Sequence, residues 1–441
     1  MTDKAENWLD AFPGPTSVWT AAPDLNGQAR GKRMPASKAR KLYSGQAKMP
    51  LSALSLDIFG DDVADSPLVF ETGDQDGFLR PTERGGLWMP WLARPAVLLP
   101  MGMEHAPDTP FQGDPRHGLA QVLNRYAERG WHVTAATELE FYLLHDETPD
   151  PVAERMQAGG DILGLKSLEI YDPFLTDLYE AAAKMGLPAE TATSESGSGQ
   201  FEVTLTHGPA MAAADNTWLF KMLVKGLAQK HGMTATFMAK PFEEDAGNGL
   251  HMHVSVLDAE GRNIFDDGTG AGTDLLRHAV GGCLSTMADA TLIFAPHENS
   301  YRRLIPGAHA PTGLSWGYEN RTVAVRIPAG PGTARRLEHR VAGGDVNPYL
   351  VFTAVLGAAL LGIEDEITPP PPLDGNAYEA DTPKLAASWE DAITRFEHST
   401  SMKRFFAEEL RRLLVCQKRQ EVQRVRELSD TAKRDLYLDR V

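Results

Sequence analysis

The sequence predicts an α+β protein with a small β-rich unit at the N-terminal end and a larger mixed unit behind it. In the first unit, the pair Asn26-Gly27 lies between two short strand-like runs within residues 18–35, which is typical of a β-hairpin. In the second unit, helical stretches alternate with strand-like runs at residues 134–144, 200–205, 250–256 and 322–327. A chain of 441 residues with 42% hydrophobic content is long enough for two or three folding units.

A helix start marks the boundary between the two units. Asp114-Pro115 places an N-cap residue and a first-turn proline before the amphipathic run 119–129. The β-rich pattern ends shortly before this point. We therefore predict an N-terminal domain at residues 1–112 and a second domain at residues 113–441.

Three segments of the second unit have clear patterns of their own. The apolar run 349–363 is shorter than the roughly 20 residues needed to cross a bilayer. It therefore predicts a buried core helix, and we expect no membrane span. The four prolines at 369–372 predict an exposed spacer, because proline cannot continue a helix. Residues 388–426 predict a charged, mostly helical segment.

Composition and motifs exclude several classes of function. A formal net charge of −17 repels phosphate backbones, so nucleic acid is not expected as a partner. The two cysteines, Cys283 and Cys416, lie far apart, which argues against a disulfide or zinc framework. The chain contains neither a P-loop nor a strand-linked glycine-rich dinucleotide motif. The first residues show no secretory signal, and we expect a cytoplasmic protein.

Four glutamates are candidates for metal binding. Glu138 and Glu140 lie two residues apart in one strand-like run, so both side chains point to the same face. Buried like charges need a cation between them, which a divalent metal supplies, although a solvated strand face explains this segment equally well. Glu195 and Glu202 flank a glycine-containing turn that allows them to converge, with an ordinary charged loop as the alternative.

Histidines and arginines supply further candidates. His251, His253 and Ser255 alternate along one face of the run 250–256. Imidazole beside carboxylates suits Mg²⁺ or Mn²⁺, whereas a pair of incidental surface histidines is the alternative. Arginines gather between residues 302 and 340, and guanidinium groups bind carboxylates and phosphates in a bidentate manner. The arginine cluster therefore indicates anionic substrates.

The order and spacing of these acids, histidines and arginines resemble the glutamine synthetase family. The resemblance covers nearly the whole chain, from the Asn-Gly hairpin region to Asn347-Pro348-Tyr349. It implies a small N-terminal β-grasp-like domain and a large catalytic domain with a curved antiparallel sheet and surrounding helices. It also implies a large homo-oligomer of stacked rings, with active sites between subunits. The implied activity is ATP-dependent ligation of glutamate to an amine through γ-glutamyl phosphate.

The resemblance also implies roles for individual residues. Two or more divalent ions, Mg²⁺ or Mn²⁺, are implied in each site, with ATP as co-substrate. One ion corresponds to Glu140, Glu195 and Glu202, and the other to Glu138, His251 and Glu338. The residues that correspond to binding of glutamate and the transferred phosphate are Gly247, Arg303 and Arg340. Those that correspond to the nucleotide side are His253, Ser255, Arg321, Arg326 and Arg336.

The chain departs from the family pattern where ammonium binds. Residues 48–55 contain no aspartate to match the family's ammonium-binding residue, and Asp57 is the nearest remaining acid. His309 stands at the position of the family's flap glutamate and could accept a proton from an alkylammonium. Together with Arg303 and Arg340, it is a candidate catalytic residue. Loss of two acids removes the trap for a small cation and leaves room for an alkylamine.

A smaller departure and two local likenesses bear on the substrates. Ala246 replaces a family asparagine near the glutamate backbone. Residues 24–33 and the pair Asp74 and Asp76 resemble the γ-glutamylputrescine and γ-glutamylpolyamine synthetases. We therefore expect a polyamine or another alkylamine, with ethanolamine, methylamine and isopropylamine left open.

Two other functions are considered beside this prediction. The first is an ammonia-using glutamine synthetase, which needs an acid from elsewhere in the fold to bind ammonium. The second is a catalytically silent regulatory homologue, which gives no reason for so many clustered charges.

Overall fold

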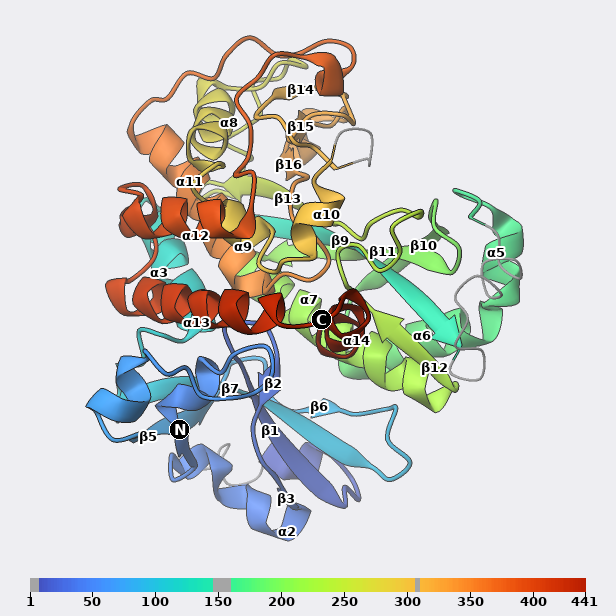
Figure 1. Cartoon of the computed structure of the whole chain (residues 1–441), viewed down its shortest axis with the longest axis vertical. Helices are drawn as coiled ribbons and strands as arrows, with labels where there is room; N and C mark the ends of the chain where they lie inside the picture. The colour runs from blue at the N-terminus through green and yellow to red at the C-terminus, as the bar shows by residue number, and fades with distance from the viewer. Residues whose placement is uncertain (1–7, 146–159, 306–309) are drawn as a thin grey trace.

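The computed structural model describes residues 8–145, 160–305 and 310–441 and contains two β-sheets, the second surrounded by helices (Figure 1). The first sheet belongs to the N-terminal part of the chain, drawn in blue. Its strands are β1 (Ser17–Pro23), β2 (Ala29–Arg30), β3 (Arg33–Pro35), β4 (Lys48–Pro50), β5 (Asp76–Pro81), β6 (Leu87–Trp88), β7 (Ala96–Ala106) and β8 (Thr109–Pro110). The short helices beside it are η1 (Trp8–Ala11), α2 (Ala36–Ala39), η2 (Arg40–Ser44), η3 (Leu51–Leu54) and η4 (Pro67–Glu71).

The first sheet has the strand order β2-β1-β7-β5-β4, with β3 beside β1 and both β6 and β8 beside β7. Strands β1 and β7 run parallel, whereas the other pairs of described strands in this sheet are antiparallel. A parallel central pair inside a small mixed sheet agrees with the expected β-grasp-like domain.

The hairpin predicted at Asn26-Gly27 is present between β1 and β2, which pair antiparallel. Gly27 has a φ of +77°, a conformation that favours glycine. The Oδ1 atom of Asp24 accepts hydrogen bonds from the backbone N–H groups of Asn26 and Gln28, at 2.9 and 2.8 Å. We refer to residues 24–28 as the hairpin tip.

The second sheet has the order β10-β11-β9-β13-β16-β15-β14, and β12 pairs with β9. Its strands are β9 (His132–His145), β10 (Ala189–Ser194), β11 (Gln200–Pro209), β12 (Met233–Thr236), β13 (Leu250–Leu257), β14 (Trp316–Tyr318), β15 (Val325–Ile327) and β16 (Leu337–His339). The described strands pair antiparallel except for β14 with β15. The strand predicted at 322–327 is shorter than expected, because Asn320 Oδ1 accepts a hydrogen bond from the backbone N–H of Thr322 and holds a turn there.

Helices cover the second sheet and complete the chain (Figure 1). They are α3 (Pro115–Ala127), α5 (Leu165–Ile170), α6 (Asp172–Met185), α7 (Ala210–Lys230), α8 (Asp274–Thr286), α9 (Thr291–Phe294), α10 (Ser300–Arg303), α11 (Pro348–Glu364), α12 (Trp389–His398), α13 (Glu408–Arg426) and α14 (Asp430–Arg440). Short turns of helix lie at η5 (Gly332–Ala334), η6 (Ala377–Glu379) and η7 (Met402–Arg404).

Three helix predictions are confirmed. Helix α3 begins at the predicted signal, since Asp114 Oδ1 accepts from the backbone N–H of Arg116 at 2.8 Å. Helix α11 corresponds to the predicted core helix and is buried along almost its whole length. The charged segment 388–426 forms α12 and α13. Within the described ranges, no helix combines the length and apolar character needed to span a membrane.

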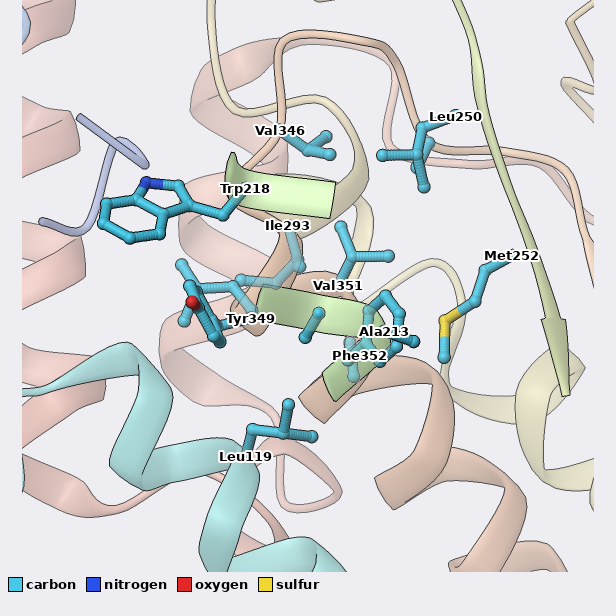
Figure 2. Packing of buried hydrophobic residues seen from close by; sticks show 14 of the residues in the cluster. Leu119, Ala213, Trp218, Leu250, Met252, Ile293, Val346, Tyr349, Val351 and Phe352 are labelled. Atoms are coloured by element: carbon cyan, nitrogen blue, oxygen red, sulfur yellow. The ribbon is translucent and has the colours of Figure 1, made fainter. Parts of the chain in front are cut away.

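Strand β13 shows how one strand contributes to both sides of the second sheet. Leu250 and Met252 point into the hydrophobic core, where Tyr349 and Phe352 of α11 also lie (Figure 2). Because side chains alternate along a strand, His251 and His253 point to the opposite face. That opposite face carries the candidate site.

The hairpin tip packs against helices of the second unit. Trp218 Nε1 on α7 donates a hydrogen bond to Gly27 O at 2.9 Å, and Asn347 Nδ2 donates to Asp24 O at 2.8 Å. Both contacts join segments far apart in the chain. The tip therefore fixes the first sheet against α7 and the start of α11.

Asn26 of the hairpin tip contacts two charged side chains of α13, Lys418 and Glu421. We call these three residues the junction triad. Lys418 Nζ lies 2.5 Å from Asn26 Oδ1 and 2.9 Å from Glu421 Oε2. Glu421 Oε1 accepts from Asn26 Nδ2 at 2.8 Å and from the backbone N–H of Ile58 at 2.9 Å. The Lys418 and Glu421 side chains are 1% and 0% exposed, so this ion pair is fully desolvated.

Candidate active site

Carboxylates and imidazoles from neighbouring strands share the face of the second sheet opposite to the core. On β9 and its neighbours, Glu140 lies opposite Glu202, and Glu138 lies opposite His251. Further along the sheet, His253 lies opposite Glu338. Directly opposite residues of an antiparallel pair point to the same face, so the register brings these side chains together.

Glu138 is at the centre of this group. Nδ1 of His251 and Nε2 of His253 each lie 2.9 Å from one of its carboxylate oxygens. Burial would raise the pKa of Glu138, but the hydrogen bonds from the two histidines outweigh burial and hold that pKa well below its usual range. Glu138 is therefore anionic and oriented.

The other carboxylates carry more negative charge than the protein neutralises. Burial, together with the charges of Glu138, Glu140 and Glu195, raises the pKa of Glu202 to about 9. Burial and the charge of Glu140 likewise raise the pKa of Glu195 to about 7. A divalent cation would supply the missing positive charge, so the donor set fits a metal with oxygen and imidazole ligands.

Among the residues that the structure describes, two groups of side chains have potential ligand atoms within 4.8 Å of one another. They are Glu138, His253 and Glu338, and Glu138, Glu202 and His251. These groupings differ from the two sets that the resemblance implied, since Glu138 belongs to both and Glu140 to neither. Glu140 Oε2 accepts a hydrogen bond from the backbone N–H of Gly249 at 2.6 Å.

Arginines surround the acidic group. Arg326 Nη1 lies 2.8 Å from Glu338 Oε2, and Arg340 donates to the other oxygen of the same carboxylate. Arg336 Nε lies 3.1 Å from Nδ1 of His253. Burial would raise the pKa of Glu338, but the charges of Arg340, the two histidines and Arg326 lower it below its usual value. The acids and arginines therefore form one continuous network.

A cavity of about 590 Å³ adjoins this network on the side of His253 and Arg336. Glu138 and Ser255 also line it, beside several threonines and small apolar residues. Ser255 Oγ donates to the backbone carbonyl of Arg335 at 2.9 Å. The volume lies within the range of pockets that bind small molecules and cofactors.

A model of the glutamine synthetase catalytic domain matches residues 112–437 of the chain. The chain belongs to the glutamine synthetase family. Family membership and the predicted fold are thus confirmed.

Individual relatives point to two kinds of activity. γ-Glutamylputrescine synthetase PuuA of Escherichia coli (strain K12) is 34% identical over 421 residues, which cover 92% of this chain and 88% of that protein. Glutamine synthetase of Pyrococcus abyssi (strain GE5 / Orsay) is 33% identical over 367 residues, covering 82% and 78%. A solved structure of apo GmaS without ligand matches with a TM-score of 0.85 and 28% identity, covering 100% of both chains.

Gly247 and Arg303, which resemble glutamate-binding positions of the glutamine synthetase family, pack against each other. Arg303 is 3% exposed, and its Nη1 donates to the carbonyl of Val341 at 2.8 Å. Burial lowers the pKa of this guanidinium. A Cβ atom at position 247 would lie 2.6 Å from Ala239 O and 2.9 Å from Arg303 Cγ, so this position requires glycine.

Two predicted residues are less closely tied to the network. Arg321 is exposed, but its charge partly offsets the rise in the pKa of Glu195 and therefore acts on the site from nearby. His309 lies outside the described residues. Its role in this glutamine synthetase homologue stays a prediction.

Sequence reasoning missed two residues that hold the loop 246–248. Gln200 Nε2 lies 3.0 Å from both Gly247 O and Asn248 Oδ1, and the hydroxyl of Tyr142 donates to Ala246 O at 2.7 Å. Gln200 and Tyr142 are opposite one another on β11 and β9. The sequence offered one signal for both residues. A polar group within an apolar strand needs a hydrogen-bond partner when it is buried.

Asp57, the acid nearest to the expected ammonium-binding position, is bound within its own chain. Its carboxylate lies 2.6 Å from Arg424 Nη1 and 2.8 Å from Gln420 Nε2, and it also accepts from the backbone N–H of Phe59 at 3.0 Å. The side chain is 0% exposed. Asp57 therefore ties the N-terminal unit to α13.

Proposed function

We propose that this protein is an ATP-dependent carbon–nitrogen ligase that joins the γ-carboxylate of glutamate to an alkylamine. One observation carries the proposal: acids, histidines and arginines from adjacent strands of a glutamine synthetase fold converge on one face of the sheet. Such a set suits two anionic substrates that must be brought together despite their charges.

Mg²⁺ or Mn²⁺ is the proposed cofactor, with at least two ions in each site. The residues proposed to hold them are Glu138, Glu140, Glu195, Glu202, His251 and Glu338. Bound ions would neutralise charge on the transferred phosphoryl group. The charge excess around Glu202 and Glu195 supports this proposal.

The arginines are proposed to bind the substrates. Arg303 and Arg340 would bind glutamate and the transferred phosphate, with the backbone at Gly247 beside glutamate. The proposed nucleotide-side residues are His253, Ser255, Arg321, Arg326 and Arg336, and three of them line or adjoin the 590 Å³ cavity. Burial of Arg303 and its hydrogen bond to the carbonyl of Val341 support a rigid, preorganised contact rather than a solvated one.

The reaction proceeds in two transfers. A γ-carboxylate oxygen of glutamate attacks the terminal phosphorus of ATP, and ADP leaves. The neutral amine then attacks the γ-carbonyl carbon, inorganic phosphate leaves, and the amine nitrogen gives up one proton. We propose His309 as the group that takes a proton from the incoming alkylammonium.

A polyamine or another alkylamine is the proposed amine. PuuA is named as a γ-glutamylputrescine synthetase, and residues 48–55 offer no acid to bind ammonium. The ionic contacts of Asp57 within its own chain support the same conclusion. The second candidate is an ammonia-using glutamine synthetase, since the Pyrococcus abyssi enzyme is almost equally similar in identity. The charge network of acids, histidines and arginines argues against a silent homologue.

The assembly and location are proposals of the same kind. We propose a large homo-oligomer of stacked rings with active sites between subunits, in the cytoplasm. We likewise propose the division into domains at residues 1–112 and 113–441. The first sheet ends at Pro110 and α3 begins at Pro115, which supports that boundary.

The deciding experiment measures phosphate release with ATP, Mg²⁺ and glutamate, and compares ammonium with putrescine, spermidine, ethanolamine, methylamine and isopropylamine. High kcat/KM for one alkylamine and low kcat/KM for ammonium would support the proposal. Preference for ammonium would assign the protein to the glutamine synthetases proper. Absence of phosphate release with every amine tested would contradict both candidate functions. In a separate experiment, the pH dependence of turnover in His309→Ala tests the proposed proton acceptor.

A further inference from the structure

A second cavity, of about 530 Å³, lies where the first sheet meets the second unit. Residues of β1, the segment 27–33, the loop after β6, helix α7 and Val441 line it. It shares no lining residue with the 590 Å³ cavity of the active site. The junction cavity, as we call it, is therefore a separate site.

Three tryptophans form much of its apolar wall. Trp218 Nε1 donates to Gly27 O at 2.9 Å, and Trp19 Nε1 donates to Ser17 Oγ at 3.2 Å, so both rings are held in place. Trp91 packs directly on α7, because a Cβ atom at Gly226 would lie 2.5 Å from its ring. Fixed flat rings of this kind provide a surface for an apolar or aromatic group.

The charged side chains of the described residues that line this cavity are all cations. They are Lys32, Arg33, Lys221 and Lys225. A local excess of positive charge is unexpected in a chain with a formal charge of −17. An anion in the cavity would be attracted by this field.

The two lysines of α7 that line this cavity differ in how the fold uses them. Lys221 Nζ donates to the carbonyls of Gly344 and Val346, at 2.9 and 3.3 Å, and lies 5.2 Å from the ring centre of Phe237. Lys225 Nζ has one long contact of 3.4 Å, to the carbonyl of Asp439. Burial, with the nearby charge of Lys221, lowers the pKa of Lys225 to about 7.

Lys225 therefore makes few contacts that stabilise the fold, although it lines the cavity. A half-buried lysine whose ammonium group has one long contact can form further hydrogen bonds. A carboxylate placed beside it would form a charge-assisted hydrogen bond.

From this geometry we infer that the junction cavity binds a small organic anion with a flat apolar body, of the class of aromatic carboxylates. The carboxylate pairs with Lys225, and the ring lies against the tryptophan wall. This site is independent of the proposed ligase reaction. Its occupant bridges the first sheet and α7.

The test is calorimetric titration of the whole protein with indole-3-acetate, in the presence of saturating ADP and glutamate so that the active site is filled. We expect one binding event per chain. Lys225→Met should weaken binding by roughly tenfold or more, since it removes a charge-assisted contact. Lys225→Arg should retain most of the affinity, and uncharged indole-3-acetamide should bind as weakly as the Lys225→Met variant binds indole-3-acetate.

Lys230→Met is the matched control on the same helix, because Lys230 pairs with Asp177 at 3.2 Å on the surface. It should leave binding unchanged. Thermal unfolding supplies a second readout, in which Lys225→Met without ligand should be at least as stable as the wild type. The inference is overturned by absence of binding at millimolar indole-3-acetate, by equal affinity in Lys225→Met, by equal affinity for the amide, or by a clear loss of stability in Lys225→Met.

Discussion

The candidate active site and the junction triad both bury charged groups, yet they treat those charges in opposite ways. In the triad, Glu421 accepts hydrogen bonds from Asn26, Ile58 and Lys418. In the site, Glu202 faces three other carboxylates, whose charges add to burial in raising its pKa to about 9. Burial also raises the pKa of Glu421, but there Lys418 and Asn26 oppose the rise. The comparison teaches that burial alone does not mark function. A buried group whose charge the protein itself leaves uncompensated marks a place for a ligand.

The largest change in free energy is expected when the junction triad is disrupted. Lys418→Met leaves Glu421 without its cation at a position of 0% exposure. Loss of one partner of a buried ion pair typically lowers the free energy of unfolding by about 3–5 kcal/mol. Denaturant unfolding monitored by circular dichroism measures this change.

Arg419→Met provides the control on the same helix, since Arg419 pairs with Glu397 at the surface. Its effect should stay below about 1 kcal/mol. Equal effects of the two substitutions would remove the contrast between the triad and an ordinary surface pair.

Glu202→Gln should lower turnover without lowering stability, whereas Lys418→Met lowers stability. It removes one charge from the crowded carboxylates, so the metal-free protein should unfold at the same temperature as the wild type or higher. Turnover should fall by at least about 100-fold, because a proposed metal ligand is lost. Phosphate release and thermal unfolding are measured on the same sample.

Glu260→Gln, at an exposed position paired with Arg262, is the matched control and should change neither quantity. Wild-type turnover in Glu202→Gln, or a clear drop in its metal-free unfolding temperature, would place Glu202 among structural residues.

Divalent ions should stabilise the site and not the triad. At Mg²⁺ concentrations of 100 times Kd, binding to the folded state adds about 2.7 kcal/mol to the free energy of unfolding. We expect this increase in the wild type, its reversal by EDTA, and a smaller increase in Glu202→Gln. Lys418→Met should keep the full increase, and its absence there would show that the two regions are coupled.

The smallest effect concerns the nucleotide side. Arg336→Lys keeps the positive charge but loses the guanidinium contact with Nδ1 of His253 at 3.1 Å. The KM for ATP should rise about tenfold or less, which corresponds to at most about 1.4 kcal/mol, with the unfolding temperature unchanged. An unchanged KM for ATP would contradict the proposed role of Arg336.

Alternation along single strands made much of the site predictable. The spacing of Glu138 and Glu140, and of His251 and His253, was sufficient to place each pair on one face. The cross-strand register, which puts Glu202 opposite Glu140, depends on tertiary pairing that one sequence does not encode visibly. The implied ligand sets could not be refined for the same reason.

The sequence did not predict the junction triad, and the reason is different. Lys418 and Glu421 are three residues apart on a charged helix, a spacing that is typical of solvated surface pairs. Their burial results from the hairpin tip packing on α13, nearly 400 residues away in sequence. The hairpin itself was predictable, because Asn26-Gly27 is a local turn signal.

The insertion of the hairpin tip also sets an order of events during synthesis. Asn26 and its partner Glu421 are separated by 395 residues. At translation rates of about 5–20 residues per second, the tip waits roughly 20 to 80 seconds for α13 to be made. During that interval the side-chain amide of Asn26 and the backbone N–H of Ile58 lack their native partners on α13. The hairpin tip is thus synthesised long before the helix that completes its final environment.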